Sequence, residues 1–501
     1  MMKQFSNYIL LLVIHLFVQT HSYAQINELP RATPESQGVP SKAIMALFDS
    51  LTHLPETDIH SVIVIRHGKV IGEMYPAPFA PEYRHTMYSC SKTFVGAAIG
   101  LVIQDNLLRL TDRVATFFPE MLPDSVSHEL ADMTIQNLLT MTSGITPDWN
   151  MRNECSDWIH TYLSKPIKTP GVTFAYDSMS TYMLSAILQK ITGMTLLDYL
   201  KLKLFNPMNI QEVAWEKSPE GINTGGWGLH IQSESLAKFG LLLLNRGKWK
   251  NKQLIPESWI DQMTNKQMEA GEEDYGYQTW QCTYPGAFRA DGALGQYILI
   301  VPSKDAVIVI TECTLINGKR QRGLVWEKLL PAMKNNPLPP SHQSNKLWKK
   351  QQQYTLPLIK GKATSRQSHL YERKNILLPA NKYGWKSFLF DFKEKEIKLT
   401  IEEANGNKYT LPFGYNHWIT SILETTPPYS IQPQGSFTGL EGPFWAAGNY
   451  AWTRHDILQL KVHYVNWVSA LDLTLHFHNN QVDITIKENF SNKNELVKGL
   501  F

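Results

Sequence analysis

The sequence has few cysteines and little net charge. The first argues against a cysteine-bound metal site, and the second argues against a nucleic-acid-binding protein. The four cysteines among 501 residues follow no metal-binding spacing, and we expect free, buried thiols, although Cys282 and Cys313 both end strand-like runs and could meet. A net charge of +3 without a dense basic stripe argues against nucleic acid as a partner. The HExxH motif of zinc hydrolases and the GxSxG motif of α/β-hydrolases are both missing from the sequence.

Long apolar runs are also scarce, and the one that stands out lies near the N-terminus, from Tyr8 to Val18. It follows a single charge, Lys3, and precedes Ser22-Tyr23-Ala24, which has small residues where signal peptides are cut. A run of about 11 apolar residues is too short for a membrane-spanning helix, which needs ~20. The pattern predicts a signal peptide over residues 1–24, cut near Ala24, and a periplasmic or secreted protein without a membrane span.

The first part of the chain alternates strand-like and helical stretches. Residues 59–75 contain two β-rich runs around a His67-Gly68 turn, and residues 100–270 are mostly helical or loop-like. Strand-like runs return between residues 275 and 313. We expect residues 25–335 to form one antiparallel sheet with helices packed on it, an α+β fold.

The composition of the sequence and its pattern of apolar and polar residues change after this first domain. A proline-rich, polar stretch over residues 336–345 is typical of a linker. Beyond it, apolar and polar residues alternate, for example on both sides of His478-Asn479-Asn480, as they do in half-buried hairpins. Residues 346–501 are therefore predicted to form a smaller, mostly β C-terminal domain.

Ser89 and Lys92, three residues apart in YSCSKTF, are the first candidates for an active site. They begin an apolar helical stretch, where the helix dipole favours a developing anion and Lys92 lies one turn further on the same face. A buried lysine at that place can lose its proton and act as a base. The alternative is a capping serine with a solvated lysine. The same spacing recurs in Ser235 and Lys238, which we interpret as part of a surface helix.

Five further segments follow in a fixed order and identify the family that the chain resembles. They are LLTMTSGI (138–145), TFAYDSMSTYMLSAILQKITG (173–193), GGWGLHIQSESLAKFGLLLLNRGKW (225–249), YGYQTW (275–280) and ADGALGQYILIVP (290–302). Together with YSCSK they resemble the beta-lactamase-related serine hydrolases, the superfamily of class C beta-lactamases, DD-peptidases, family VIII esterases, D-aminopeptidases and 6-aminohexanoate-dimer hydrolases. The resemblance covers roughly residues 30–335 and implies a beta-lactamase/transpeptidase-like fold.

The resemblance implies roles for individual residues. Ser89 matches the acylated nucleophile and Lys92 its lysine partner. Tyr176 matches the tyrosine that moves a proton between the nucleophile and the leaving group, and we expect nearby cations to lower its pKa. Ser178 replaces an asparagine of the family and is expected to hydrogen-bond Lys92 or the substrate.

The segment ADGALGQ departs further from the family pattern. Ala290 stands where lactam-binding relatives carry Lys or His, which weakens the case for a substrate carboxylate. Arg289 could replace that cation, but strand alternation points it to the other face. Asp291 and Gly292 follow; Asp291 is either a surface strand residue or an anchor for a substrate amine. The backbone N–H of Ala293 matches the second oxyanion donor, beside that of the nucleophile.

These residues predict an exported serine hydrolase that cleaves an ester or amide bond of a small-molecule or peptide-like substrate through an acyl-enzyme. Neither a metal nor an organic cofactor is indicated. The alternatives are a beta-lactamase or DD-peptidase-type penicillin-interacting protein, and a non-catalytic sensor or binding protein on the same fold. For the C-terminal domain, a lid over the cleft, a docking module and a stabilising cap are all compatible with the sequence.

Overall fold

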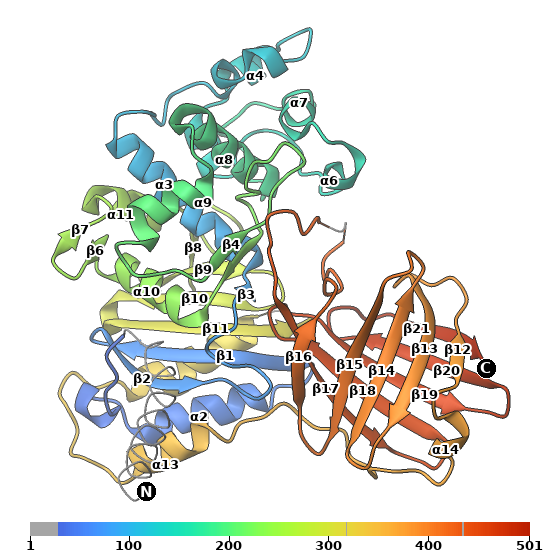
Figure 1. Cartoon of the computed structure of the whole chain (residues 1–501). Helices are drawn as coiled ribbons and strands as arrows, with labels where there is room; N and C mark the ends of the chain where they lie inside the picture. The colour runs from blue at the N-terminus through green and yellow to red at the C-terminus, as the bar shows by residue number, and fades with distance from the viewer. Residues whose placement is uncertain (1–28, 317, 433–434) are drawn as a thin grey trace, which may run out of the picture.

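The structure is a computed structural model that describes residues 29–316, 318–432 and 435–501. The predicted signal peptide, residues 1–24, lies outside these ranges. Two large sheets lie side by side, the first with helices packed on it and the second built almost entirely of strands (Figure 1). Within the described ranges, no helix is long and apolar enough to cross a membrane.

The first large sheet has six antiparallel strands in the order β2-β1-β11-β10-β9-β8. Their sequences are rich in β-branched residues, and β11 is buried at all of its 9 positions because helices cover both faces. The predicted hairpin around His67-Gly68 is confirmed by the pairing of the first two strands. The strands are β1 (Thr57–Arg66), β2 (Lys69–Met74), β8 (Trp280–Gln281), β9 (Phe288–Gly292), β10 (Gln296–Val301) and β11 (Ala306–Thr314).

Helices on the two faces of this sheet enclose two separate cores. The helix that follows Ser89 is apolar on every side and is almost wholly buried, as such a helix must be. Its glycines allow close packing, since a Cβ on Gly100 would lie 2.1 Å from Nε1 of Trp259. The larger core contains α3 (Ser91–Gln104), α8 (Ser178–Thr192) and α10 (Ser233–Leu244), and the smaller contains α2 (Ser41–Thr52) and α13 (Gln343–Gln351).

The second large sheet has ten strands in the order β15-β14-β13-β12-β21-β20-β19-β18-β17-β16, and a further pairing of β15 with β17 closes it on itself. The expected alternation is present, because every second side chain of β20 is buried inside. The strands are β12 (Asn375–Leu377), β13 (Trp385–Phe392), β14 (Glu396–Glu403), β15 (Lys408–Tyr415), β16 (Ile419–Leu423), β17 (Phe444–Trp452), β18 (Ile457–Tyr464), β19 (Ala470–Phe477), β20 (Gln481–Glu488) and β21 (Asn494–Leu500).

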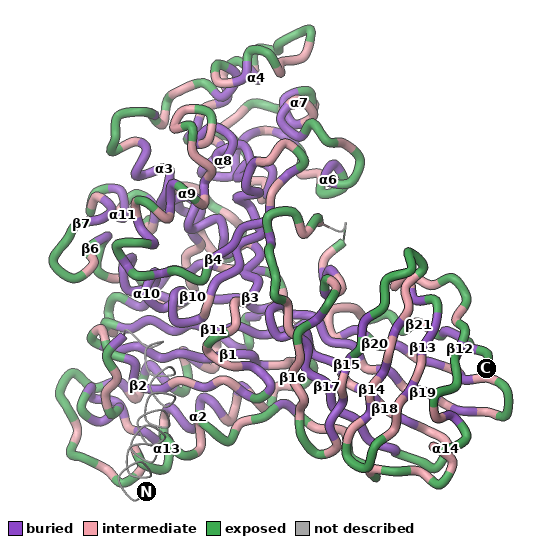
Figure 2. Tube along the Cα trace, viewed as in Figure 1, coloured by how far each residue is buried: buried purple, intermediate pink, exposed green. Residues whose placement is uncertain are grey.

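Shorter elements connect these parts, and Figure 2 shows the buried residues gathered in α3, α8 and the strands of both large sheets. The short helices are α4 (His128–Asp132), α5 (Ile135–Leu139), α6 (Met151–Glu154), α7 (Trp158–Leu163), α9 (Leu196–Leu200), α11 (Glu257–Thr264), α12 (Lys319–Leu324) and α14 (Ser368–Tyr371). The short strands are β3 (His85–Thr86), β4 (Val213–Trp215), β5 (Leu229–Ile231), β6 (Lys248–Trp249) and β7 (Lys252–Gln253).

The boundary between the two parts differs from the predicted linker over residues 336–345. Helix α13 begins inside that stretch, at Gln343, and its Leu347 is buried in the same core as Ile44 of α2. Residues just beyond 345 therefore pack on the first sheet, although the sequence placed them in the C-terminal domain. The polar composition of this segment did not indicate a helix, because Leu347 is the one buried residue of α13.

Candidate active site

Ser89 lies in a tight turn, Tyr88–Cys90, that leads directly into α3. Tyr88 has a φ of 44°, which few residues other than glycine adopt, so the backbone is strained immediately before the candidate nucleophile. The Ser91 hydroxyl holds the turn, because it donates to the Tyr88 carbonyl oxygen at 2.5 Å and accepts from the Leu229 N–H at 3.2 Å. Ser89 is thereby presented at the start of the helix, where the dipole favours negative charge.

Lys92 is buried beside Ser89, with 1% of its surface exposed. Its Nζ donates to the Ser89 hydroxyl at 3.1 Å, to the Ser178 hydroxyl at 2.7 Å and to the Gly226 carbonyl oxygen at 2.7 Å. Burial lowers the pKa of Lys92 to about 7, although the carboxylate of Asp177 acts in the opposite direction. Near neutral pH a large fraction of Lys92 is therefore an uncharged amine in contact with a hydroxyl, as a general base must be.

Tyr176 lies against the same pair. The centroid of its ring is 4.7 Å from Lys92 Nζ, and it lines the same cavity as Ser89. The expectation of a lowered pKa is wrong: burial raises the pKa of Tyr176 above the ordinary value of 10, and the nearby carboxylate of Asp291 adds to this effect. Tyr176 is therefore suited to donate and relay a proton as a neutral hydroxyl.

The start of α8 fixes the chain that carries Tyr176 and Ser178. Asp177 caps this helix, because its carboxylate accepts from the backbone N–H groups of Met179 at 2.9 Å and Ser180 at 3.0 Å. With the backbone held at this point, the side chains on both sides of Asp177 reach Lys92. The hydrogen bond that we expected between Ser178 and Lys92 is present.

The turn between β9 and β10 borders the same cavity as Ser89. A Cβ on Gly292 would lie 2.3 Å from the Met87 carbonyl oxygen, so glycine allows β9 to approach the segment that carries Ser89. Leu294 has a φ of 61°, which gives the turn its tight form. Ala293 lies in this turn and lines the cavity, and its backbone N–H remains our candidate for the second oxyanion donor.

Strand β9 sends Ala290 and Arg289 to opposite faces of the sheet, as alternation predicted. Ala290 is fully buried in the core beneath α3 and brings no cation to the cavity. Arg289 lies with Cys282 on the other face but also reaches the edge of the cavity. The site therefore lacks the cation that lactam-binding relatives carry at the position of Ala290.

Asp291 lines the cavity inside a group of four charged side chains. Its carboxylate accepts from Arg289 at 2.7 Å and lies 3.7 Å from the guanidinium of Arg322. Arg289 also contacts Glu273 at 2.6 Å, and Arg322 lies 3.6 Å from it. Two arginines thus balance two carboxylates, which counts against Asp291 as an anchor for a substrate amine. The sequence did not single out Glu273 or Arg322, because their pairing joins distant segments.

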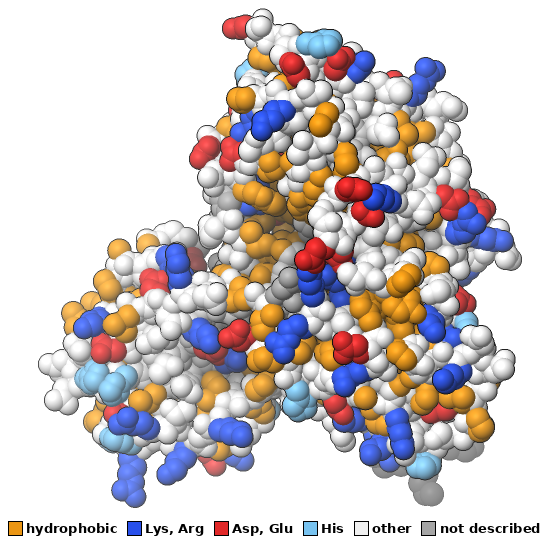
Figure 3. Space-filling model, turned by 180° about the vertical axis from the view of Figure 1, so that it is seen from behind, with side chains coloured by type: hydrophobic (Ala, Val, Ile, Leu, Met, Phe, Trp, Pro, Cys, Tyr) orange, Lys and Arg blue, Asp and Glu red, His pale blue; other side chains and the backbone are white. Residues whose placement is uncertain are grey.

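The cavity at Ser89 has a volume of about 730 Å³, which is within the usual range for a small-molecule site. Three aromatic residues, Trp149, Tyr176 and Trp280, form part of its wall, and Ile431 and Gln432 reach it from the second sheet. A hollow lined by hydrophobic side chains, with acidic and basic groups at its edge, is visible where the large parts of the molecule meet (Figure 3).

The comparisons with known proteins agree with this geometry. A family model described as Beta-lactamase matches residues 53–321, more than half of the chain. The chain belongs to the Beta-lactamase family. The resemblance and the fold class predicted from the sequence are thereby confirmed.

Among curated proteins, this member of the Beta-lactamase family is similar to a 6-aminohexanoate-dimer hydrolase of Paenarthrobacter ureafaciens. The identity is 24% over 328 residues, which cover 58% of this chain and 83% of that protein. It is also 24% identical over 198 residues to a beta-lactamase of Yersinia enterocolitica, covering 39% of this chain and 47% of that protein.

Solved structures with a similar course of the chain include a 6-aminohexanoate-dimer hydrolase homologue from Bacillus anthracis, with 21% identity, a TM-score of 0.48 and coverage of 66% of this chain and 87% of that chain. An octameric penicillin-binding protein homologue from Pyrococcus abyssi has 15% identity and a TM-score of 0.46. In that comparison the coverage is 92% of this chain and 98% of that chain.

The second serine–lysine pair, Ser235 and Lys238, lies on α10. The prediction that this helix lies at the surface is wrong. Both residues are 4% exposed, and the helix packs in the larger core of this Beta-lactamase family member. Lys238 Nζ donates to the carbonyl oxygens of Met208 at 3.3 Å and Asn209 at 2.9 Å. These contacts give Lys238 a structural role in joining α10 to the segment before β4.

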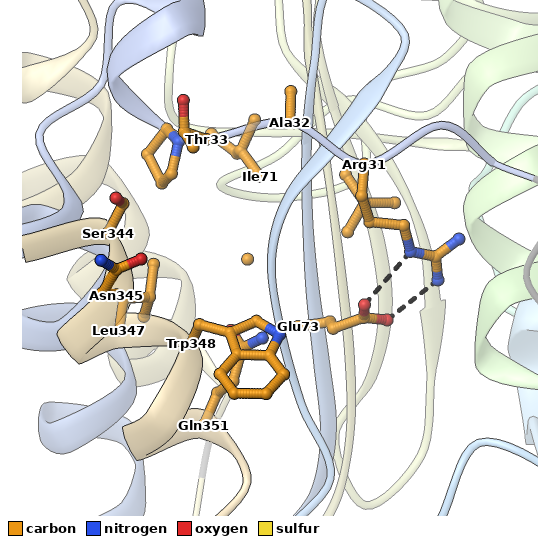
Figure 4. Close-up of a pocket in the computed structure, with 13 residues that line it drawn as sticks. Arg31, Ala32, Thr33, Ile71, Glu73, Ser344, Asn345, Leu347, Trp348 and Gln351 are labelled. Atoms are coloured by element: carbon orange, nitrogen blue, oxygen red, sulfur yellow. Dashed lines mark hydrogen bonds and ion pairs between the residues drawn. The ribbon is translucent and has the colours of Figure 1, made fainter. Parts of the chain in front are cut away.

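A second cavity, of about 370 Å³, lies between β2, residues 31–34 and α13 (Figure 4). Its carboxylate, Glu73, accepts hydrogen bonds from Arg31 at 3.2 and 3.0 Å, and Trp348 lies at one side. No lysine, histidine or cysteine is among the described residues that line it. The carboxylate of Glu73 is bound by Arg31, so the described lining offers Ser344 no partner comparable to Lys92 at Ser89.

Proposed function

We propose that the protein is a serine hydrolase that cleaves an ester or amide bond through an acyl-enzyme formed on Ser89. The observation that supports this most strongly is the contact of 3.1 Å between Lys92 Nζ and the Ser89 hydroxyl, at a place where burial lowers the pKa of Lys92 to about 7. A nucleophile, a base and an open cavity then meet at the start of one helix.

In the proposed first step, the Ser89 oxygen attacks the carbonyl carbon and its proton moves to neutral Lys92. The neutral amine keeps two N–H bonds, which suit the Ser178 hydroxyl and the Gly226 carbonyl oxygen, and its lone pair is left for Ser89. The negative charge that develops on the substrate oxygen is stabilised by the backbone N–H groups of Ser89 and Ala293.

The leaving alcohol or amine needs a proton as its bond to the carbonyl carbon breaks. Tyr176 supplies it, since it lies beside Lys92 and Ser89 in the cavity and stays protonated, and the proton held by Lys92 replaces it. Water then attacks the acyl-enzyme, and the same groups return the proton to Ser89. The cycle ends with a free acid and the original protonation state.

The preferred substrate is an uncharged ester or amide. Ala290 offers no cation for a carboxylate, and Arg289 is already engaged with Asp291 and Glu273. The similarity to a protein named 6-aminohexanoate-dimer hydrolase makes linear amides natural substrates to test beside simple esters. We also propose that the protein is exported and that cleavage near Ala24 removes its first 24 residues.

The test combines fluorophosphonate labelling with turnover of p-nitrophenyl acetate. Wild-type protein should react with the label and hydrolyse the ester, and Ser89→Ala should do neither. Ser235→Ala is the matched control, since it removes the serine of the second Ser-x-x-Lys pair. Labelling of Ser89→Ala together with loss of labelling in Ser235→Ala would move the nucleophile to the other pair. A folded wild type that neither reacts nor hydrolyses esters or amides would favour a sensor or binding protein.

A further inference from the structure

The chain between β16 and β17 reaches from the second sheet to the cavity at Ser89. Residues 429–432 of this connection are here called the cleft segment. Its last two residues, Ile431 and Gln432, line the cavity together with Ser89 and Tyr176. In Figure 1 the connection leaves the second sheet beside β16 and runs toward β4 of the first domain. The C-terminal domain therefore contributes part of the wall of the candidate active site.

One buried carboxylate fastens this connection at two points. Glu216, which follows β4, is 1% exposed. Its Oε2 accepts from the Tyr429 hydroxyl at 3.0 Å, and its Oε1 accepts from the Ser436 N–H at 3.1 Å. The next residue continues the attachment, because the Lys217 N–H donates to the Thr438 carbonyl oxygen at 2.8 Å. Truncation of Glu216 would leave the buried Tyr429 hydroxyl and the partly buried Ser436 N–H without their acceptor, which is costly.

The cleft segment is also supported from the side of the nucleophile. The Ser430 hydroxyl accepts from Nε1 of Trp467 at 2.9 Å. The ring of Trp467 makes an edge contact with Tyr88, with 6.4 Å between the ring centroids. Tyr88 immediately precedes Ser89, so the cleft segment and the nucleophile's turn pack against the same indole.

A second link joins the cleft segment to the opposite aromatic wall of the cavity. Tyr429 lies close enough to Arg152 for the two groups to interact electrostatically, and the guanidinium of Arg152 lies 4.9 Å from the ring centroid of Trp149 and 4.8 Å from that of Trp227. Trp149 lines the cavity. The position of the cleft segment is thus coupled to the placement of an aromatic side chain that a substrate would touch.

The side chains around the cavity indicate what kind of group it takes. Ile431, Trp149 and Trp280 offer apolar surface, and the amides of Gln432 and Asn150 offer hydrogen bonds. An elongated acyl chain with an amide or hydroxyl group satisfies both kinds of contact. A short acyl group such as acetyl would leave this surface unused.

We propose that the cleft segment selects the acyl group of the substrate. Ile431 contacts an apolar acyl chain, and Gln432 hydrogen-bonds an amide or hydroxyl carried by that chain. Glu216 is a positioning residue, since it acts through Tyr429 and touches no substrate itself. This inference rests on the proposed function of Ser89, and it gives the C-terminal domain a direct part in substrate recognition.

The test compares kcat/KM for p-nitrophenyl octanoate and p-nitrophenyl acetate, which share one leaving group. Ile431→Ala should lower the octanoate-to-acetate ratio about tenfold, mainly through KM, because several apolar contacts are lost. Ile422→Ala is the matched control in the same domain: Ile422 lies on β16 with 54% of its surface exposed, and its removal should leave the ratio unchanged.

Gln432 and Glu216 are tested in the same assay. Gln432→Leu should lower kcat/KM for the p-nitrophenyl ester of adipic acid monoamide and spare the hexanoate ester. Glu216→Ala should reduce the octanoate-to-acetate ratio as Ile431→Ala does. Glu216→Gln should restore part of it, because its amide oxygen can still accept from Tyr429 or Ser436. If Glu216→Ala does not fold, Ile431→Ala and Glu216→Gln carry the test.

The two proposals fail in different ways. Wild-type protein that neither binds a fluorophosphonate nor hydrolyses p-nitrophenyl acetate contradicts the proposed function. Wild-type protein that hydrolyses both esters, together with Ile431→Ala that keeps the wild-type ratio, overturns the role of the cleft segment and leaves the Ser89 chemistry in place. Loss of both activities in equal proportion in Ile431→Ala also overturns it, since selection must change one ester more than the other.

Discussion

Replacement of Lys92 is the most informative single perturbation of the site. With a pKa near 7 instead of the ordinary 10.5, the neutral amine is favoured by about 5 kcal/mol compared with a lysine in water. At pH 7 roughly half of Lys92 is then neutral, compared with about one in three thousand for an exposed lysine. Lys92→Arg keeps the positive charge at every usable pH and Lys92→Met removes the amine, so each should lower kcat/KM about 10² to 10⁴-fold.

The assay is the pH dependence of kcat/KM for a neutral ester, which reports the free enzyme. Activity should rise with pH through an apparent pKa of about 7, because the base acts in its neutral form. The matched control is Lys238→Met, which removes a buried lysine that donates to the carbonyl oxygens of Met208 and Asn209, and its profile should overlay that of the wild type. A wild-type profile without a step between pH 5.5 and pH 9, or Lys92→Arg with near-normal turnover, would refute the reasoning.

The same pKa makes a prediction about stability. Between about pH 7 and pH 10.5 the unfolded chain binds a proton at Lys92 that the folded chain does not, so the free energy of unfolding rises with pH in that window. Relative to Lys92→Met, the wild type should gain about 2 kcal/mol between pH 7 and pH 9. Denaturant unfolding at several pH values measures this difference, and a difference that is constant with pH would mean that Lys92 is not strongly perturbed.

Three further predictions concern catalysis, selectivity and packing. Tyr176→Phe should lower the turnover of amides more than that of p-nitrophenyl esters, whose leaving group needs no proton, and equal rates in wild type and variant on amides would remove the residue from the mechanism. The wild type should hydrolyse a cephalosporin more slowly than its best ester, and Ala290→His should raise cephalosporin acylation more than ester hydrolysis; fast cephalosporin turnover by the wild type would restore the beta-lactamase reading. Gly100→Ala should lower the free energy of unfolding in denaturant by about 1–3 kcal/mol, because the added Cβ meets Trp259. Gly323→Ala is the control and should not destabilise the fold, because no atom lies nearer than 3.9 Å to its Cβ. Equal stabilities of the two variants would show that α3 can shift.

Local features of the site were accessible from the sequence because they depend on short stretches of chain. Ser89 lies in the turn before α3 and Lys92 lies at the start of that helix, so their contact joins residues only three apart in the chain. Ser178 was identified as a site residue through the resemblance to a family motif. Its hydrogen bond to Lys92 joins residues that are far apart in the sequence, so only the structure shows it. The β1–β2 hairpin was also local, since two apolar runs flank a tight turn.

What the sequence did not reveal depends on contacts between distant segments. The raised pKa of Tyr176 reflects burial, which no neighbour in the sequence indicates. Lys238 was expected at the surface because charged side chains usually are. It is buried instead, and its Nζ donates to the carbonyl oxygens of Met208 and Asn209, which are distant in the sequence. Ile431 and Gln432 lie in the connection between β16 and β17, far along the chain from Ser89, and Glu216 bonds this connection on both sides of them.

The central claim is that an acyl group is transferred to Ser89. Its most direct measurement is the mass of the protein after brief reaction with an activated ester and quenching in acid, followed by proteolysis. We predict a single added acyl group on the peptide that contains Ser89, absent from Ser89→Ala and unchanged in Ser235→Ala. An acyl group found on another residue, or turnover that continues in Ser89→Ala, would contradict the account.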